Sequence, residues 1–394
     1  MRHERVVVLG AGPAGLAVAA CLVATGLDPL VLERGDGVGR SWRRHYDRLH
    51  LNTPKALSHL PGLRFPRAAP TYPSRAELVA YLEHYARRSR LRIDFGCEVG
   101  RVAPARGAWR VEHSRGELSA ASVVVATGNA AEPIVPRWPG IESFPGAFLH
   151  SGSYRNGREL RGRQVLVVGF GCSAGEIGLD LAEHGARPVF SVRGGVNVVP
   201  RDLMGIPMLY LGVAFSRLPP VLLDAVSRPF ATPRPRELAR LGLRRSPRGP
   251  ARQTAEKGRL PLIDAGTIDL LRRGGARVRP AIERFEGAEV RFVDGSGERF
   301  DAVIAATGFR AGVDRFLDLG APLVADGRLR LPSGTATSFP GLYFCGFEVV
   351  SDGMLRRTAR EARRLAPLVA GRERALRSPG RGADSLAELP AARA

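Results

Sequence analysis

Two glycine-rich segments constrain the fold of this chain more than any other feature. The first reads RVVVLGAGPAGLAVAACLVATG from Arg5 to Gly26, and the second reads QVLVVGFGCSAGEIGLDLAEHG from Gln164 to Gly185. In each, a short apolar run predicts a buried strand, and the residues after the glycines predict a helix. A chain of 394 residues that carries this pattern twice is predicted to be α/β, with two dinucleotide-binding (Rossmann-like) domains.

The first segment has Gly10, Gly12 and Gly15 in the GxGxxG spacing. The first glycine permits a tight turn, the second lets a diphosphate approach the backbone, and the third lets helix and strand pack closely. A second strand, expected over Pro29–Leu32, leads to Glu33, close to the offset of about 20 residues at which an acid binds ribose hydroxyls. These residues predict a first dinucleotide site.

The second segment repeats the plan with Gly169, Gly171 and Ser173, and alanine replaces the third glycine. The strand expected over Pro188–Val192 is followed by Arg193 instead of an acid. A carboxylate would repel a 2′-phosphate, whereas an arginine can pair with it through two charge-assisted hydrogen bonds. The two loops therefore predict two different cofactors, FAD at the first and NADPH at the second.

Two further segments, VVVATG ending at Gly128 and VIAATG ending at Gly308, are expected where the chain passes between the domains. Their threonines, Thr127 and Thr307, belong to the predicted cofactor-binding residues. The FAD domain is predicted to be discontinuous, with the NADPH domain inserted into it. The predicted ranges are 1–150 and 302–372 for the FAD domain, 151–301 for the NADPH domain, 203–254 for a helical segment that shapes the substrate pocket, and 373–394 for a disordered tail.

The formal net charge is +21, which would ordinarily suggest a nucleic-acid or anionic membrane surface. Only two of the 59 basic residues are lysines, however, and the arginines are scattered along the chain. This skew is typical of a GC-rich genome, so we expect no nucleic-acid partner.

The four cysteines, Cys21, Cys97, Cys172 and Cys345, show no CxxC or metal-ligand spacing. We expect no metal site and a cytoplasmic location. The apolar stretch Leu203–Ser216 is too short to span a bilayer and contains Pro207, so a lid or tunnel wall is expected there. A peripheral membrane contact and a homodimer stay open.

The segment FPGAFLHSGSY, from Phe144 to Tyr154, fits the FxGxxxHxxxY pattern and resembles the flavin-containing monooxygenases. The related Baeyer–Villiger enzymes have tryptophan where Tyr154 stands. Other segments are similar to the plant-type members that make auxin from indole-3-pyruvate. They are YDRLHLNTPKAL (46–57), YPSRAELVAYLEHYA (72–86), ATGNAAEPIVP (126–136), VVPRDLMG (198–205) and FDAVIAATGFR (300–310).

This resemblance implies an enzyme in which NADPH reduces FAD, and in which oxygen then adds at flavin C4a to give a (hydro)peroxyflavin. One oxygen atom would enter a small organic substrate, so the partners are that substrate and O₂. The implied FAD residues are Gly10, Gly12, Gly15, Glu33, Gly39, Arg40 and Trp42, and the implied NADPH residues are Gly169, Gly171, Ser173 and Arg193. Trp42 is read either as a wall against the flavin or as ordinary core.

Asn52 is the predicted catalytic residue. Animal and bacterial members of the family have an asparagine at this position near flavin C4a, whereas the auxin-making plant members typically differ there. An amide can donate a hydrogen bond without a change of protonation state, which suits a role in stabilising activated oxygen. The alternative is that Asn52-Thr53-Pro54 is only a turn. His150 and Tyr154 are read as packing residues in preference to acid–base groups.

Two reactions stay open, namely oxidative decarboxylation of a 2-oxo acid and oxygenation of a nitrogen or sulfur atom. Arginines in the 203–254 segment (Arg217, Arg228, Arg234 and Arg236) favour an anionic substrate, although the arginine-rich composition weakens that argument. Outside this class, the chain could be an FAD-dependent NAD(P)H:acceptor oxidoreductase without a stable oxygen adduct. A non-catalytic, dinucleotide-binding sensor is the third reading.

Overall fold

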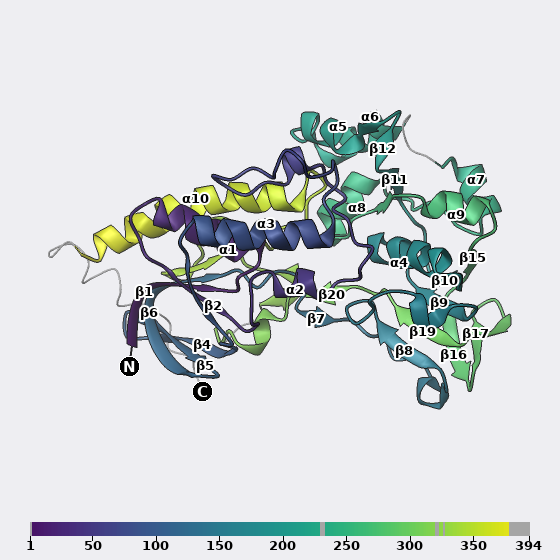
Figure 1. The fold of residues 1–394 in the computed structure, drawn as a ribbon, viewed down its shortest axis with the longest axis horizontal. Coiled ribbons are helices and arrows are strands. Elements are labelled where there is room, and N and C mark those ends of the chain that lie inside the picture. Colours follow the sequence, from purple (N-terminus) through teal and green to yellow (C-terminus); the bar gives the residue numbers. More distant parts are fainter. Residues whose placement is uncertain (1, 229–232, 320–322, 326–327, 378–394) are drawn as a thin grey trace.

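The computed structural model describes residues 2–228, 233–319, 323–325 and 328–377. It is an α/β structure in which two sheets lie side by side, and a group of short helices lies above the second sheet (Figure 1). Each sheet is built around one of the two glycine-rich segments. The predicted fold class of two Rossmann-like domains is therefore confirmed.

The first sheet contains the first glycine-rich segment. Its strands are β1 (Arg2–Leu9), β2 (Leu30–Glu33), β3 (Arg92–Phe95), β4 (Val99–Ala105), β5 (Ala108–His113), β6 (Gly116–Val125) and β23 (Leu342–Phe344). The order across the sheet is β3-β2-β1-β6-β5-β4, and β23 pairs in parallel with the carboxyl half of β6. The parallel strands end at one edge, which is where open α/β sheets bind ligands.

Helices α1 (Pro13–Val23), α3 (Arg75–Arg88) and α10 (Met354–Ala375) contribute to one core on a face of this sheet. Helix α1 packs against α10, so the two ends of the described chain meet in that core. At the start of α3, the N–H of Glu77 donates to Ser74 Oγ at 3.3 Å, and the Glu77 carboxylate accepts from the Ser74 N–H at 2.7 Å. Such a capping box stabilises a helix by about 1 kcal/mol.

The second sheet contains the second glycine-rich segment, and all of its strands are parallel. They are β8 (Ala147–His150), β9 (Gln164–Val168), β10 (Arg187–Ser191), β15 (Arg277–Arg279) and β19 (Ala302–Ala305), in the order β15-β10-β9-β19-β8. Helices α4 (Cys172–Glu183) and α9 (Thr267–Arg272) pack on one face. An antiparallel ribbon of β16 (Ile282–Glu286), β17 (Glu289–Phe292) and β18 (Gly297–Arg299) packs on the other face.

The two sheets repeat one hydrogen-bond plan. The Gly10 N–H donates to Leu32 O at 2.8 Å, and the Gly169 N–H donates to Ser191 O at 2.9 Å. After the strand on the other side, the Ala126 N–H donates to Leu9 O and the Ala306 N–H donates to Val168 O, both at 2.9 Å. Each ATG segment therefore lies beside the glycine loop of its own sheet, and the chain changes sheet directly after it.

The two crossings lie next to each other. Strand β7 (Glu132–Pro133) on the outward path pairs antiparallel with β20 (Phe309–Arg310) on the return path. The sheet topology corrects the predicted domain boundaries at residues 150 and 302. Strands β8 and β19 pair with each other in the second sheet, although the predicted ranges gave both to the first domain. They belong to the second domain because β19 pairs with β9, the strand that leads into the second glycine loop.

The predicted start of the tail at residue 373 is also wrong. Helix α10 continues to Ala375, and the buried Glu373 accepts a hydrogen bond from Ser122 Oγ at 2.7 Å. This contact ties the last turns of the helix to β6. The remainder of the predicted tail, 378–394, lies outside the described residues.

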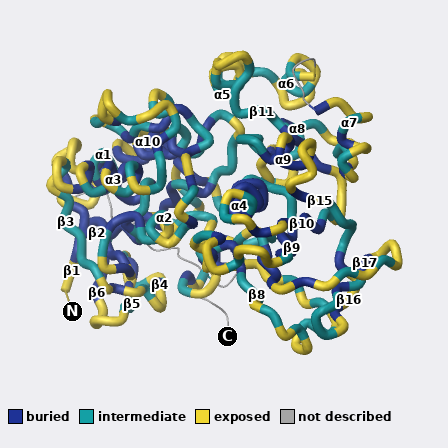
Figure 2. The backbone as a smooth tube through the Cα atoms, turned by 45° about the vertical axis from the view of Figure 1, so that its right-hand side comes forward, coloured by how far each residue is buried: buried dark blue, intermediate teal, exposed yellow. Residues whose placement is uncertain are grey.

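A lid segment, defined as residues 198–264 without the undescribed 229–232, covers part of the second domain. It contains the strand pairs β11 (Val198–Pro200) with β14 (Leu262–Asp264) and β12 (Asp202–Leu203) with β13 (Ile206–Pro207), and helices α5 (Met208–Ala214), α6 (Pro220–Ser227), α7 (Pro235–Arg240) and α8 (Pro250–Lys257). Helices α5 and α6 are far less buried than α4 (Figure 2).

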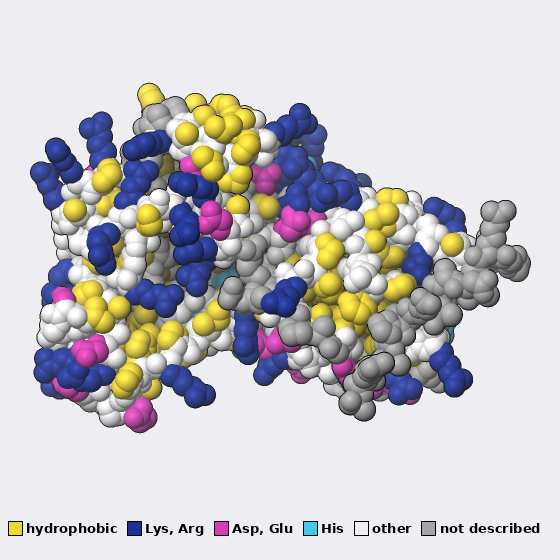
Figure 3. Space-filling view, turned by 180° about the vertical axis from the view of Figure 1, so that it is seen from behind, with side chains coloured by type: hydrophobic (Ala, Val, Ile, Leu, Met, Phe, Trp, Pro, Cys, Tyr) yellow, Lys and Arg dark blue, Asp and Glu magenta, His cyan; other side chains and the backbone are white. Residues whose placement is uncertain are grey.

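Apolar side chains on the lid face solvent. Met204 is 95% exposed, Ile206 60% and Val221 58%. A space-filling view shows hydrophobic side chains gathered at the top of the molecule, with basic side chains on both sides (Figure 3). In the part of the chain that the structure describes, no helix has both the length and the apolar character needed to cross a bilayer.

The FxGxxxHxxxY motif is part of the packing of the second domain. The buried Tyr154 hydroxyl donates to Asp180 Oδ2 at 2.5 Å, and the Gly157 N–H donates to the same oxygen at 2.8 Å. His150 Nδ1 accepts from the Gly152 N–H at 3.1 Å, and Nε2 lies 3.1 Å from Gly308 O. Burial lowers the pKa of His150, which favours the neutral ring that this pairing requires. Both side chains thus have a structural role.

Replacing Tyr154 with phenylalanine should destabilise the second domain and leave NADPH oxidation unchanged. The change leaves the buried Asp180 carboxylate without one donor, which costs about 1–3 kcal/mol of unfolding free energy. Urea denaturation of the FAD-loaded protein measures this loss, and Tyr210→Phe, at a half-exposed tyrosine of the lid, is the control. Unchanged stability together with lost NADPH oxidation would show instead that Tyr154 takes part in the reaction.

Candidate active site

The first glycine loop leaves open space at the amino end of α1. Gly10 has a φ of +100°, and a Cβ on Gly15 would lie only 1.8 Å from Gly10 O, so both positions need glycine for the fold itself. Gly12 is different, because a Cβ there would meet nothing within 4 Å. The fold itself therefore does not require glycine at position 12. The open space there fits a binding site, or cradle, for a diphosphate at the positive amino end of α1.

Glu33 is buried at the end of β2 and holds this loop in place. Its carboxylate accepts from the Ala11 N–H at 2.7 Å and from the Gly35 N–H at 2.8 Å. A carboxylate can accept about four hydrogen bonds, so capacity for a ribose hydroxyl remains. The spacing of Glu33 in the sequence did not predict this structural role. Its role toward ribose stays a prediction.

The next residues predicted to contact FAD follow on helix α2 (Arg40–Arg43) and its cap. The Gly39 N–H donates to Ala11 O at 2.9 Å, with a φ of +67° at Gly39, so this turn is tied to the glycine loop. Arg40 is half-buried, and Trp42 packs against the cores of both domains. Trp42 therefore lies at the domain junction, and its role as a wall against the flavin stays a prediction.

The second glycine loop has the same construction. Gly169 has a φ of +119°, and its Cβ would lie 2.6 Å from Ala306 O, whereas a Cβ on Gly171 would meet nothing within 4 Å. Ser173 lies in the first turn of α4 and is hydrogen-bonded to Tyr46. The loop thus offers a second cradle at a helix amino end.

Arg193 lies two residues beyond the end of β10 and is exposed. Among the described residues, no carboxylate pairs with it, so its guanidinium is free for an anionic ligand. Ser191 is occupied, because its hydroxyl donates to Pro280 O at 2.8 Å. Of the remaining predicted residues, Thr127 is exposed beside the first loop, and the Thr307 hydroxyl donates to Ile134 O at the domain crossing.

The two loops are held relative to each other by residues 46–49, the start of the segment YDRLHLNTPKAL, whose structural role was not predicted from the sequence. Tyr46 and Leu49 of the first domain are buried in the core of the second. Between them, Arg48 donates to Glu176 Oε2 at 2.6 Å and, through two nitrogens, to Glu183 at 2.8 and 2.9 Å. Burial raises the pKa of Glu176, and the guanidinium opposes that shift. The burial of Tyr46 and Leu49 follows no simple alternation in the sequence, because Asp47 and Arg48 stand between them.

Asn52 follows this segment and is half-buried in a turn. Its Oδ1 is buried and has no hydrogen-bond partner among the described residues. The neighbouring Thr53 hydroxyl is satisfied by Ser58 Oγ at 2.6 Å, so the turn does not need the Asn52 side chain for its own hydrogen bonds. This oxygen is therefore available to accept a hydrogen bond from a bound group or from water. The two open cradles and this amide fit the predicted cofactors.

Helix α5 of the lid lies over this turn. A Cβ on Gly353 would lie 3.6 Å from Leu209 Cδ2 and 3.7 Å from Thr53 Cγ2, so all three residues meet at one point. A second contact joins the lid to the first domain, since the Tyr72 hydroxyl donates to Asp202 Oδ1 at 2.5 Å. The Arg201 guanidinium also lies 4.3 Å from the centre of the Tyr72 ring.

Known proteins share this architecture and much of this sequence. The family model described as pyridine nucleotide-disulphide oxidoreductase matches residues 7–198. Indole-3-pyruvate monooxygenase YUCCA1 of Oryza sativa subsp. japonica is 42% identical over 348 residues, which are 86% of each chain. The probable indole-3-pyruvate monooxygenase YUCCA1 of Arabidopsis thaliana is 37% identical over 86% of this chain and 84% of its own length.

Solved structures agree with this match. The flavin-containing monooxygenase from Stenotrophomonas maltophilia superimposes with a TM-score of 0.74 at 25% identity, covering 94% of this chain and 99% of its own. A cyclohexanone monooxygenase shares the fold, with a TM-score of 0.70 at 20% identity over 95% of this chain and 88% of its own.

Alanine at Gly12 or Gly171 should separate cofactor binding from folding. Because neither Cβ meets a protein atom, we expect unchanged thermal stability of the cofactor-free chain. Gly12→Ala should weaken FAD binding, and Gly171→Ala should weaken NADPH binding with FAD retained, each by at least about tenfold. Fluorescence titration measures both affinities. Gly100→Ala, which also fills open space but lies in β4, is the control. Wild-type affinity in either variant would remove that loop from the predicted cofactor site.

Replacing Arg193 with glutamine should raise the KM for NADPH by roughly tenfold to a hundredfold, since charge-assisted hydrogen bonds contribute about 1.5–3 kcal/mol. The KM for NADH, which lacks the 2′-phosphate, should stay constant. Arg187→Gln, at the opposite end of β10, should change neither value. Equal increases for both nucleotides would contradict the assignment of Arg193 to the 2′-phosphate.

Proposed function

The chain belongs to the flavin-containing monooxygenase family, and we propose that it oxidatively decarboxylates a 2-oxo acid of the indole-3-pyruvate type. The observation that carries this proposal is the 42% identity, over 86% of both chains, to an indole-3-pyruvate monooxygenase. As in that family, FAD and NADPH are the cofactors and O₂ is the second substrate. Asn52 marks a departure from the auxin-making members, so oxygenation of nitrogen or sulfur is the competing reaction.

In this reaction the chain's own residues bind and orient the cofactors. The backbone around Gly12 and Gly171 would hold the two diphosphates at the amino ends of α1 and α4. Glu33 fixes the first loop and has capacity left for a ribose hydroxyl, and Arg193 is free for the 2′-phosphate. FAD, when bound and reduced by NADPH, supplies the electrons that activate O₂.

Asn52 and the lid would provide the environment for oxygen transfer. The Asn52 amide can donate to a negatively charged oxygen without itself gaining or losing a proton. Leu209 of α5 and Thr53 both lie close to Gly353, so α5 brings an apolar side chain near this turn. Excluding water there would limit the loss of activated oxygen as hydrogen peroxide.

The proposed reaction is balanced as follows. Indole-3-pyruvate, NADPH, O₂ and one proton give indole-3-acetate, CO₂, NADP⁺ and water. The bond between the carboxyl and the carbonyl carbon breaks, and one atom of O₂ becomes part of the new carboxylate. The other atom leaves as water, and NADPH is the reductant.

The test is to measure NADPH oxidation, O₂ uptake and CO₂ release with indole-3-pyruvate, and then with an amine and a sulfide. We expect one CO₂ per NADPH with the 2-oxo acid and one ¹⁸O atom from ¹⁸O₂ in the shorter acid. Product from the amine or sulfide alone would favour the competing reaction. Reduction of artificial acceptors without product from any of them would indicate an acceptor oxidoreductase.

We also infer a cytoplasmic location, which the four free cysteines support. The exposed apolar side chains of the lid, among them Met204, Ile206 and Val221, support a peripheral contact with an anionic surface or with a second copy.

Replacing Asn52 with alanine should uncouple the reaction. We expect NADPH to reduce the flavin at close to the wild-type rate, and we expect hydrogen peroxide released per NADPH to rise at least about threefold, because one hydrogen-bond donor is lost. Stopped-flow absorbance and a peroxidase assay measure the two quantities. If Asn52 is only a turn residue, the variant will lose thermal stability while its peroxide yield stays at the wild-type value.

A further inference from the structure

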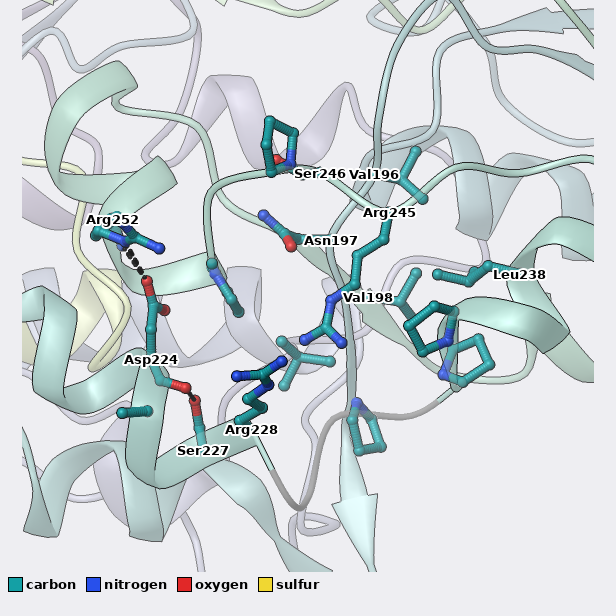
Figure 4. Close-up of a pocket in the computed structure, with 18 of the residues that line it drawn as sticks. Val196, Asn197, Val198, Asp224, Ser227, Arg228, Leu238, Arg245, Ser246 and Arg252 are labelled. Carbon is teal, nitrogen blue, oxygen red and sulfur yellow. Dashed lines mark hydrogen bonds and ion pairs between the residues drawn. The ribbon is translucent and has the colours of Figure 1, made fainter.

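A cavity of about 500 Å³ lies inside the lid, between β11 and helices α6, α7 and α8 (Figure 4). This volume lies within the range of pockets that hold small organic ligands. Much of its lining is apolar and includes the buried Val196, Val198 and Leu238, together with Val221, which is also 58% exposed to solvent. These side chains form a surface suited to a flat hydrocarbon or aromatic group.

Two arginines from different elements point into this cavity. Arg228 ends helix α6, and Arg245 lies in the loop between α7 and α8, and their guanidinium groups approach the same central space (Figure 4). Among the described residues, neither has a carboxylate within ion-pair distance. Two unpaired guanidiniums around one apolar cavity create a positive potential that a carboxylate would neutralise.

The acid in the cavity wall does not supply that neutralisation. Asp224 Oδ1 accepts from the Ala251 N–H at 2.8 Å, and its Oδ2 accepts from Arg252 Nε at 3.1 Å (Figure 4). Its charge is therefore balanced by the amino end of α8 and by Arg252. Asn197 is also occupied, because its Nδ2 donates to Arg248 O and to Gln253 Oε1, both at 2.9 Å.

Only helix α5 lies between the cavity and the turn that carries Asn52. Met208, the first residue of α5, lines the cavity, and the next residue, Leu209, meets Thr53 at Gly353. A ligand in the cavity would thus be separated from the candidate active site by the wall that α5 provides.

We propose that this cavity recognises the carboxylate-bearing substrate, with Arg228 and Arg245 binding the carboxylate and the apolar wall holding an aromatic body. This assignment rests on the proposed function. It identifies Arg228 and Arg245 as the residues that make the site selective for substrates with a carboxylate. It also separates arginines that the sequence could not distinguish, because Arg228 lines the cavity whereas Arg217, Arg234 and Arg236 do not.

The test is calorimetric titration of the FAD-loaded chain, without NADPH, with indole-3-acetate and with its neutral counterpart indole-3-acetamide. The variants are Arg228→Gln, Arg245→Gln, the double variant, and Arg245→Lys as the conservative change. Arg217→Gln, in the same segment but outside the cavity, is the control. Because neither cavity arginine has an ion pair among the described residues, glutamine should leave the fold intact, and thermal denaturation checks this.

We expect each single glutamine variant to weaken binding of the acid about tenfold and the double variant more, with partial recovery in Arg245→Lys. Binding of the amide, and all binding by Arg217→Gln, should stay at the wild-type level. Wild-type affinity for the acid in the double variant would overturn the proposal, and so would an equal loss for the amide. A loss confined to NADPH affinity would overturn it too, because the cavity would then hold the nucleotide's phosphates.

The outcome is distinguishable from a failure of the proposed function. If the wild-type chain binds indole-3-acetate through these arginines but does not oxidise NADPH with indole-3-pyruvate, the acid site stands and the proposed reaction is wrong. If it oxidises NADPH with indole-3-pyruvate and the double variant keeps the same KM, the reaction stands and the acid site is wrong.

Discussion

The insertion of residues 42–49 into the second domain is the interaction on which the rest of the site depends. Trp42 contacts both cores, Tyr46 and Leu49 are buried in the second one, and Arg48 binds two glutamates of α4. A surface ion pair alone would contribute little, but this one is anchored by buried apolar groups on both sides and includes the buried Glu176. It fixes the glycine loop of one domain relative to that of the other. Asn52 follows directly, so its position is set by the same contact.

The sequence was sufficient for the local elements. Strand–glycine–helix patterns predicted both Rossmann-like units, since the steric needs of Gly10, Gly15 and Gly169 leave few alternatives. It was insufficient for the domain boundaries. Strands β8 and β19 are short runs that would suit either sheet, and only the pairing of β19 with β9, and of β8 with β19, assigns them to the second.

The candidate site was predictable where residues are close in the chain and unpredictable where they are distant. The loops, Glu33 and Arg193 follow from spacing. Tyr154 belongs to a motif read as a sign of oxygen chemistry, yet its hydroxyl binds Asp180 within the same domain. Arg228 and Arg245 could not be selected from so many arginines, because the cavity that distinguishes them forms only when α6, α7 and α8 pack together.

The path of the chain has a consequence for synthesis on the ribosome. The second domain is a continuous insertion whose first and last sheet strands, β8 and β19, lie next to each other. Its sheet can therefore be completed once residue 305 has left the ribosome. The first domain starts earlier but finishes later, because β6 awaits β23 and α1 awaits α10. Its amino-terminal half must therefore wait with an exposed apolar helix while the inserted domain folds. Packing of α10, the last described helix, against α1 is therefore the final step in the folding of the whole molecule.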